Sequence, residues 1–378
     1  MLTPTAQAAR RFLRRALGLD APFPDVAAAL AHHGYVQLDP INVCGRMHDL
    51  ILRNRVAGYR EHDLQRHLHG PDPAGRAPPP PDQRVGFEHY LPDTGVLVAF
   101  PSSAWPALVP SMEARRVRPR GYSGRLSASE EQLARRVLDA LADRGPLTSD
   151  DVAVSLGEAA RAVTAWGSRT RLVKRVLDKL FFHGRVLITA RRGFRRVYDL
   201  PERVLPAAVL RAPRPSDEEA RRLAVLLRLR QRRLAGLSRA ELPLVADHVR
   251  QVRLPGCPPC AVLTSDAEAL AAAEDSGDRS DPAPRLLAPL DPLIYDRRLT
   301  AGLWGFPYTW EVYTPETKRL RGYYALPVLA GLELVGHVDP RADRERSRLE
   351  VVSRRVRRGV RVQPAVRELA AFLGLAAR

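Results

Sequence analysis

Lysine is scarce in this chain of 378 residues, although basic residues are abundant. Lysine and arginine together number 60, yet lysine occurs only at Lys174, Lys179 and Lys318. The formal net charge is nevertheless +18, which favours a polyanionic partner. Because codon usage alone enriches arginine in some genomes, the places where the charge clusters carry more weight than its total.

Cysteine is also rare, with Cys44, Cys257 and Cys260 as its only occurrences. Three cysteines cannot build a disulfide framework, so we expect a reducing compartment. No apolar run approaches the roughly 18 residues of a membrane span. Arg10 and Arg11 interrupt the N-terminus before the apolar core of a signal peptide forms. We therefore expect a soluble cytoplasmic protein that makes no membrane contact.

The motifs of the common enzyme classes are missing. The sequence has no Walker loop, G-x-S-x-G elbow, H-E-x-x-H pair or glycine-rich dinucleotide fingerprint. Cys257 and Cys260 have the spacing of metal ligands, but no second pair follows them, so a zinc or redox site is disfavoured. The sequence thus predicts neither a bound metal nor a cofactor.

Residues 34–43 combine an alternating pattern with two polar side chains. Residues 23–33 are predicted to form a short helix that stops at the glycine opening this segment. In the extended stretch that follows, Gln37 and Asp39 lie two residues apart and share one face. Pro40 restricts Asp39 to extended conformations and so fixes the aim of its carboxylate. On spacing alone, a strand edge with solvated polar side chains explains this pattern better than a catalytic pair.

Residues 130–200 carry the clearest local pattern. Helices are predicted at 130–142, 147–156 and 170–182, followed by strands at 186–190 and 196–200, which is the winged-helix order. The third helix is expected to turn Lys179 outward with its other basic residues. An arginine-rich wing around an apolar tip suits a DNA groove. The candidate DNA-binding residues are Arg171, Lys174, Arg175, Arg191, Arg192, Phe194, Arg195 and Arg196.

The rest of the chain predicts further winged helices and a terminal sheet. Other helices are expected at 5–17, 47–56, 62–68, 217–234, 239–249 and 364–373, and short strands at 310–313, 322–329, 332–338 and 349–352. We predict an α+β, mainly helical fold of tandem winged-helix units with a small C-terminal β-barrel. The first expected domain, at 1–122, is a winged-helix unit that carries the Gln37 and Asp39 stretch. A second winged-helix unit follows at 123–212 and a third, reduced one at 213–285. The barrel and its closing helix take up 286–378.

Taken together, these segments resemble the AlkZ/YcaQ family of winged-helix DNA glycosylases, in its Gln-x-Asp branch. The resemblance is carried by residues 35–39, Arg46-Met47-His48, Trp166-Gly167, the wing at 191–200, Pro289-Leu290-Asp291, Asp296-Arg297, Gly322-Tyr323-Tyr324, Leu326-Pro327 and residues 336–339. It implies that Gln37 and Asp39 are catalytic. We expect Asn42, Arg46 and His48 to support them.

The resemblance implies a DNA glycosylase that hydrolyses the N-glycosidic bond of N7-alkylated purines, including bulky adducts and interstrand crosslinks, without a metal or cofactor. The partner would be double-stranded DNA carrying alkylated bases, bound by a monomer associated with the nucleoid. No lysine lies between Met1 and Val173, so we expect a monofunctional enzyme that forms no Schiff base and leaves an abasic site.

Two other functions would also require the basic helices and the wing. The chain could be a non-catalytic winged-helix regulator, which has no use for Gln37 and Asp39, or a protein that only shields lesions. The sequence does not show which adduct is preferred, or whether the protein serves general repair or self-resistance to a DNA-alkylating compound. It also leaves open whether the base is flipped and how residues 87–117 fold.

Overall fold

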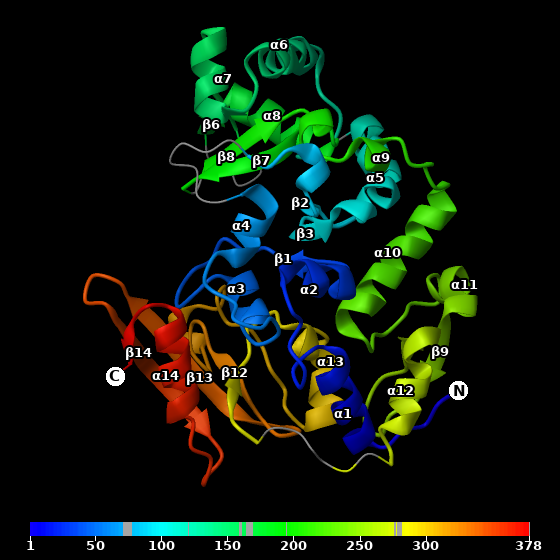
Figure 1. Ribbon diagram of the computed structural model, residues 1–378, viewed down its shortest axis with the longest axis vertical. Helices are drawn as coiled ribbons and strands as arrows, with labels where there is room; N and C mark the ends of the chain where they lie inside the picture. The colour runs from blue at the N-terminus through cyan, green and yellow to red at the C-terminus, as the bar shows by residue number, and fades with distance from the viewer. Residues whose placement is uncertain are drawn as a thin grey trace. The chain divides into compact units, whose positions relative to one another are not determined.

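The computed structural model describes residues 1–70, 78–119, 121–158, 161–163, 169–193, 195–275, 277 and 282–377. It is an α+β protein whose chain divides into two compact units (Figure 1). Unit 1 consists of Met1–Asp63 and Val225–Arg378, and unit 2 of Leu64–Ala224. Helix α10, Asp217–Arg232, crosses from one unit into the other. Across the described ranges, no helix is both long and apolar enough to span a membrane.

The N-terminal part of unit 1 follows the predicted order of helices. It contains α1 (Ala6–Ala16), α2 (Val26–His33), the two-residue strand β1 (Val36–Gln37) and α3 (Met47–Leu52). The Thr5 hydroxyl caps α1 by accepting a hydrogen bond from the amide of Ala8. Helix α2 ends at Gly34, which has a φ of +77°, and a Cβ there would lie 2.9 Å from Leu227. Glycine therefore directs the chain from α2 into β1.

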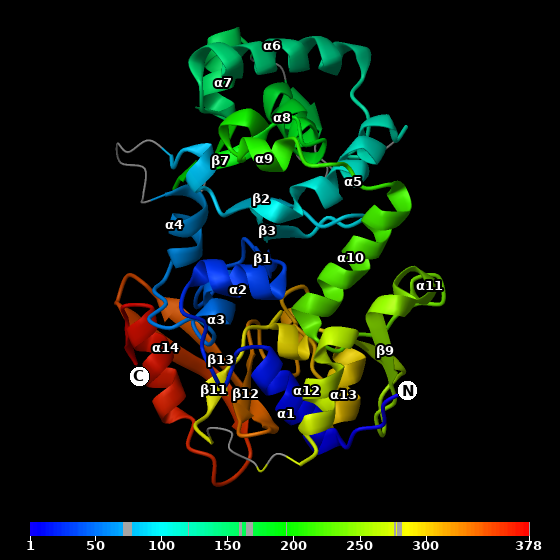
Figure 2. The ribbon, with the colours of Figure 1, turned by 45° about the vertical axis from the view of Figure 1, so that its right-hand side comes forward.

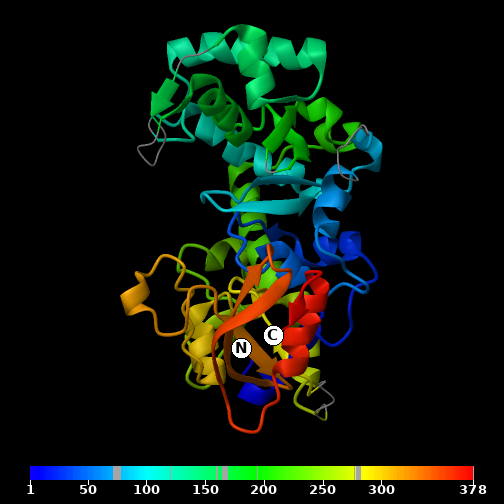
Figure 3. The same ribbon diagram turned by 90° about the vertical axis from the view of Figure 1, so that its left-hand side faces the viewer.

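The C-terminal part of unit 1 is an open, curled sheet (Figures 1 and 3). Its strand order is β11–β12–β13–β14–β15, and α14 (Gln363–Phe372) lies against it. The strands are Arg285–Leu286, Leu326–Ala330, Glu333–Asp343, Arg348–Val356 and Ala376–Ala377. Strands β11 and β15 remain its edges within the described residues, so the expected barrel is not closed there.

The strand predicted at 310–313 is wrong. The Glu311 carboxylate accepts hydrogen bonds from the amides of Leu320 and Arg321, at 2.9 and 2.8 Å. These bonds fold residues 306–323 into a loop, and they satisfy the backbone locally instead of in a sheet. No periodicity in the sequence signals a carboxylate that organises a loop from within.

The remaining part of unit 1 contains a hairpin among three short helices and the C-terminal end of α10. The helices are α11 (Leu242–Val245), α12 (Ala267–Ala272) and α13 (Arg297–Trp304), with the end of α10, and the hairpin is β9 (Val249–Val252) with β10 (Cys260–Leu263). The two strands flank residues 254–259. The helix expected at 239–249 is much shorter, since β9 begins at Val249 and Pro243 lies in the first turn of α11.

Unit 2 places three helices before a hairpin, in the predicted order. They are α6 (Ala128–Arg144), α7 (Ser149–Leu156) and α8 (Leu172–Phe182), followed by β7 (Leu187–Arg192) and β8 (Arg195–Asp199); Figure 2 shows α6 and α7 with α8. Strand β8 also pairs with β4 (Leu147–Thr148). The unit's other elements are α4 (Asp63–His69), whose first residue belongs to unit 1, β2 (Gly86–Tyr90), β3 (Leu97–Pro101), α5 (Trp105–Val117), β5 (Arg161–Val163), β6 (Arg169–Arg171) and α9 (Ala207–Leu210).

One residue of α8 departs from the predicted outward face. Lys179 is 4% exposed, and its ammonium donates to Glu130 at 2.7 Å and to the Arg125 carbonyl at 3.0 Å. The same Glu130 carboxylate accepts the amide of Ser127 in the capping box of α6. Lys179 therefore joins α8 to the start of α6, and its charge is compensated inside the unit.

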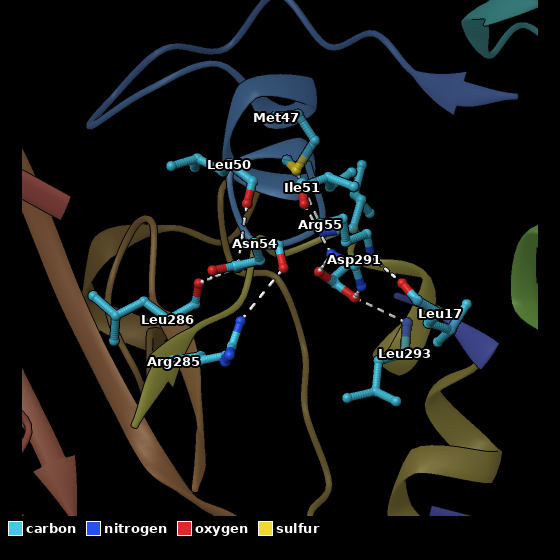
Figure 4. Close-up of polar contacts among 11 residues, drawn as sticks. Leu17, Met47, Leu50, Ile51, Asn54, Arg55, Arg285, Leu286, Asp291 and Leu293 are labelled. Atoms are coloured by element: carbon cyan, nitrogen blue, oxygen red, sulfur yellow. Dashed lines mark hydrogen bonds and ion pairs between the residues drawn. The ribbon is translucent and has the colours of Figure 1, made fainter. Parts of the chain in front are cut away.

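A buried ion pair fixes α3 within unit 1 (Figure 4). Arg55 and Asp291 are both fully buried, and two guanidinium nitrogens donate to the two carboxylate oxygens at 2.8 and 2.6 Å. Arg55 also donates to the carbonyls of Leu17 and Ile51, both at 2.9 Å. The pair thus connects the end of α1, the helix α3 and the segment before α13. Asn54 adds a hydrogen bond to the carbonyl of Leu286 at 3.0 Å.

Replacing Arg55 by alanine should destabilise the protein by about 3–5 kcal/mol, because Asp291 would be left buried and unpaired. Asp291→Ala should cost a similar amount. The double variant Arg55→Met/Asp291→Leu should lose less than either single variant, since no lone charge remains. Urea unfolding followed by circular dichroism measures all three.

Arg346→Ala is the matched control, because Arg346 forms an exposed pair with Asp343 and should change stability by under about 0.5 kcal/mol. Equal losses for the buried and exposed arginines would contradict the assignment of Arg55.

Candidate functional site

The stretch that carries Gln37 and Asp39 is buried rather than solvated. Tyr35, Val36 and Leu38 are at most 6% exposed, and Gln37 is 8% exposed. Asp39 is the first residue of the stretch to be half-buried. The interpretation as a solvated strand edge is therefore wrong. A buried amide followed by a partly accessible carboxylate instead makes this stretch a candidate site.

The Gln37 side chain offers an uncompensated acceptor. Its amide oxygen is buried and has no hydrogen-bond partner among the described residues. Leaving such a group unpaired costs about 1–3 kcal/mol, so buried polar atoms of this kind need an explanation in terms of function or strain. An acceptor that is held ready for a water or a sugar hydroxyl is one such explanation.

The Asp39 carboxylate is held by its own turn. Its Oδ1 accepts a hydrogen bond from the amide of Ile41 at 2.9 Å, across Pro40. Burial raises the pKa of Asp39 above its ordinary value, and the bond from Ile41 offsets part of that rise. The second carboxylate oxygen has no hydrogen-bond partner among the residues that the structure describes, so it is available to a ligand.

Tyr324, from the C-terminal half, lies close to this turn, and Asp339 holds its backbone. The sequence marked both residues only as part of the resemblance. Asp339 accepts the amides of Tyr323 and Tyr324 at 3.0 and 2.9 Å. A Cβ at Gly322 would lie 2.1 Å from Asp339, so glycine permits this approach. Burial raises the pKa of Tyr324 well above its usual value, and the acidic groups of Cys44 and Asp39 act in the same direction. Tyr324 therefore stays protonated near the candidate carboxylate.

The three expected supporting residues occupy different environments. Asn42 is exposed, and its backbone pairs with that of Arg46, which closes the turn after Asp39. Arg46 is half-buried and precedes the first turn of α3. His48 is 2% exposed, with its Nε2 3.8 Å from Asp49 Oδ2. Asp49 in turn accepts the hydroxyl of Tyr59 at 2.7 Å. Asn42 is thus accessible to a ligand, while His48 belongs to the buried support of the turn.

The candidate DNA-binding residues of unit 2 are mostly paired with carboxylates. Exposed pairs join Arg171 and Arg195 to Asp150 and Arg192 to Asp151, while Arg175 pairs with Glu130 and Arg196 with Asp178. Exposed pairs contribute little to stability, so their arginines can exchange a carboxylate for a phosphate. Lys174 is exposed and forms no ion pair within the described part of the chain. Phe194 lies outside the described residues.

Arg191 differs from the other wing arginines because its partner is buried. It binds both carboxylate oxygens of Glu88, one of them at 2.8 Å, and Glu88 is fully buried. His69 lies 2.7 Å from the same carboxylate. Although burial alone would raise it, the pKa of Glu88 is held well below its usual range by Arg191 and His69. The charge of Arg191 is therefore neutralised by Glu88 inside unit 2, and this ion pair holds β7 against β2.

The two closely spaced cysteines do not form a reactive site. Cys260 is buried, and burial raises the pKa of its thiol to about 12, so it stays protonated. Within the described ranges, no three His, Cys, Asp or Glu side chains gather closely enough to hold a metal ion.

Comparisons with known proteins show the family and the fold of the chain. The family model described as DNA glycosylase AlkZ-like matches residues 30–377. The solved structure of Streptomyces sahachiroi DNA glycosylase AlkZ is similar, with a TM-score of 0.65 and 18% sequence identity over 100% of both chains. At that identity, the structural match establishes a shared fold.

The two kinds of wing arginine should respond oppositely to alanine substitution. Arg195→Ala should lower the salt slope of duplex binding by about one unit, because one phosphate contact is lost, and should leave stability nearly unchanged. Arg191→Ala should keep the slope but destabilise the protein by about 3–5 kcal/mol, because Glu88 is left unpaired. Fluorescence anisotropy in a series of salt concentrations and urea unfolding measure the two effects.

Glu88→Gln/Arg191→Ala serves as the control, since removing both charges should recover part of the lost stability. A flattened salt slope in Arg191→Ala without loss of stability would show that this arginine binds DNA directly.

Proposed function

Because the chain belongs to the AlkZ-like DNA glycosylase family, we propose that it hydrolyses the N-glycosidic bond of N7-alkylated purines in duplex DNA, including bulky adducts and interstrand crosslinks. Asp39 and Gln37 are its proposed catalytic residues. The observation that carries this proposal is the buried amide oxygen of Gln37, which has no hydrogen-bond partner among the described residues, two residues before a half-buried carboxylate that the Ile41 amide holds by one oxygen. A DNA-binding regulator has no need for either feature.

The proposed chemistry suits a base that is already cationic. Alkylation at N7 makes the purine a good leaving group, so the bond breaks without a general acid and the sugar acquires positive charge. An ionised carboxylate at about 4 Å, with an effective dielectric constant of about 20, stabilises that charge by roughly 4 kcal/mol. This corresponds to about a thousandfold in rate. Asp39 fits this role, and it can also orient or deprotonate the attacking water.

Gln37 would act without adding charge. A neutral amide both donates and accepts hydrogen bonds, so it can hold the attacking water or the sugar while Asp39 faces the developing cation. The protonated hydroxyl of Tyr324 keeps a second negative charge away from the carboxylate. The proposal therefore assigns one charged group to the reaction and neutral groups to its surroundings.

The product would be an abasic site in an unbroken strand. A glycosylase that also cuts DNA commonly forms a Schiff base through an amine. All three lysines of the sequence lie beyond residue 173, and Lys179 is buried against Glu130. We also propose that α6–α8 with the β7–β8 hairpin act as a winged-helix unit that holds the duplex through exposed arginines.

Release of 7-methylguanine from alkylated duplex DNA tests the proposed site. Asp39→Asn should reduce the single-turnover rate by about a thousandfold, as the Coulomb estimate requires. Gln37→Ala should reduce it by about ten- to a hundredfold, because one positioning hydrogen bond is lost. Chromatography of the released base measures both rates.

Val352→Ala provides a control in the same unit, since Val352 is 60% exposed on β14 and should change the rate little. Equal background release by all variants and the wild type would leave the regulator or the lesion-shielding protein as the function. Strand breaks that appear without heat or alkali would contradict the monofunctional assignment.

The acid side of the pH profile should also report Asp39. Its ionised form is the active one, and burial raises its pKa above the ordinary value of 3.8. Activity should therefore fall as pH drops through this raised value, at a pH where an exposed aspartate would still be ionised. Single-turnover rates, corrected for spontaneous base loss, should show this fall in the wild type and lack it in Asp39→Asn. The same acid limb in both proteins would assign it to another group.

A further inference from the structure

A second feature of unit 1 lies between the loop 306–323 and the C-terminal sheet. A pocket of about 680 Å³ is formed there by Phe306, Leu320, Arg321, His337, Arg355 and Arg357, among others. Its volume falls in the range of small-molecule sites, roughly 300–1,000 Å³. Figure 3 shows the loop, which carries the short helix η7 (Glu316–Lys318), extending away from the sheet.

The sheet side of the pocket is organised by a pair of cross-strand neighbours. His337 on β13 lies directly opposite Arg355 on β14, so the two side chains share one face of the sheet. Burial lowers the pKa of His337, and the charges of Arg321 and Arg355 lower it further. His337 is therefore a neutral imidazole that can donate or accept a hydrogen bond beside a guanidinium.

The charge of the pocket is positive and poorly compensated. Among the described residues, neither Arg355 nor Arg357 forms an ion pair, and both are exposed. Arg321 pairs with Glu311 at 3.7 Å, and no acidic residue lines the pocket. Arg346 and Arg348, at the turn of the same β13–β14 hairpin, pair with Asp343. The pocket thus carries two exposed guanidinium groups that have no ion-pair partner among the described residues.

The loop side of the pocket is apolar and fixed in place. Leu320 is 84% exposed, which is unusual for a leucine held by an ordered loop. The amide of Leu320 donates to the Glu311 carboxylate at 2.9 Å, so the loop presents this side chain at a defined position. Phe306 is half-buried and stacks on Tyr308, with 6.3 Å between ring centroids. A ligand that combines an anion with a flat apolar body matches both sides of the pocket.

We infer that this pocket binds one nucleotide of the DNA strand, with its phosphate between Arg355 and Arg357 and its sugar and base against Leu320 and Phe306. The inference rests on the proposed function, because it takes a DNA strand as the occupant. The pocket and the Asp39 turn belong to the same unit, and residues 322–324 connect the loop to Asp339 and Tyr324. A nucleotide held in the pocket would therefore set the register of the strand relative to Asp39.

Binding to an undamaged, fluorescein-labelled duplex tests this inference without base release. The double variant Arg355→Ala/Arg357→Ala should lower the salt slope by about one unit, because the one phosphate that both arginines contact is no longer neutralised. Arg355→Lys/Arg357→Lys should keep the wild-type slope. Leu320→Ala should weaken binding about fivefold at every salt concentration, because it removes apolar contact but no charge.

Arg367→Ala and Val117→Ala are the matched controls, since both residues are exposed and lie outside the pocket. The inference is overturned if the double alanine variant changes the slope no more than Arg367→Ala, or if Leu320→Ala binds like Val117→Ala. It is also overturned if deoxyguanosine monophosphate binds the wild type and not the double variant while duplex binding is unaffected, since the pocket would then serve a free nucleotide.

Failure of the inference is distinguishable from failure of the proposed function. Unchanged duplex binding by the pocket variants, together with release of 7-methylguanine by the wild type, would remove the pocket and keep the glycosylase. Absence of base release, with the expected loss of about one unit of slope, would remove the glycosylase and keep the pocket as a DNA contact.

Discussion

The ion pair between Arg55 and Asp291 is the contact on which the candidate site depends. Both charges are fully buried, and such a pair is tolerable only because the guanidinium also reaches the carbonyls of Leu17 and Ile51. Three segments that are distant in sequence, the end of α1, α3 and residues 291–294, are thereby held at one point. Helix α3 packs against β1, so the position of Gln37 follows from a contact that touches no part of the proposed chemistry.

A net charge of +18 says less about function than the partners of the individual charges. Arg55 and Arg191 have buried carboxylate partners, and they serve the architecture of their units. Arg195 has an exposed partner that solvent and salt already weaken, so its charge can be transferred to a phosphate. Arg355 has no ion-pair partner among the described residues, so its charge can bind a phosphate without first breaking an ion pair. Similar arginines thus have three different roles, and burial of the partner separates them.

Local signals in the sequence were sufficient for most helices and for the end of α2 at Gly34, because caps and apolar periodicity act over a few residues. They were insufficient where a distant carboxylate decides the outcome. Lys179 has the spacing of an exposed residue, but it is buried by Glu130, 49 residues away. The segment around Trp310 has the composition of a strand, but Glu311 draws the amides of Leu320 and Arg321 into a loop. Both errors arise from tertiary contacts that override local preference.

The candidate site likewise has features that local sequence predicts and features that depend on distant contacts. The spacing of Gln37 and Asp39 indicated a shared face, while their burial, which separates a site from a solvated edge, depends on packing against segments far away. That burial also bears on the substrate. An ionised carboxylate can stabilise a cationic sugar, but in that form it provides no acid to protonate a neutral purine as it leaves. Tyr324 is held so firmly protonated that it is a poor acid, and the Gln37 amide donates hydrogen bonds but is too weak an acid to transfer a proton. On the proposed function, the set of side chains itself restricts the reaction to bases that already carry positive charge.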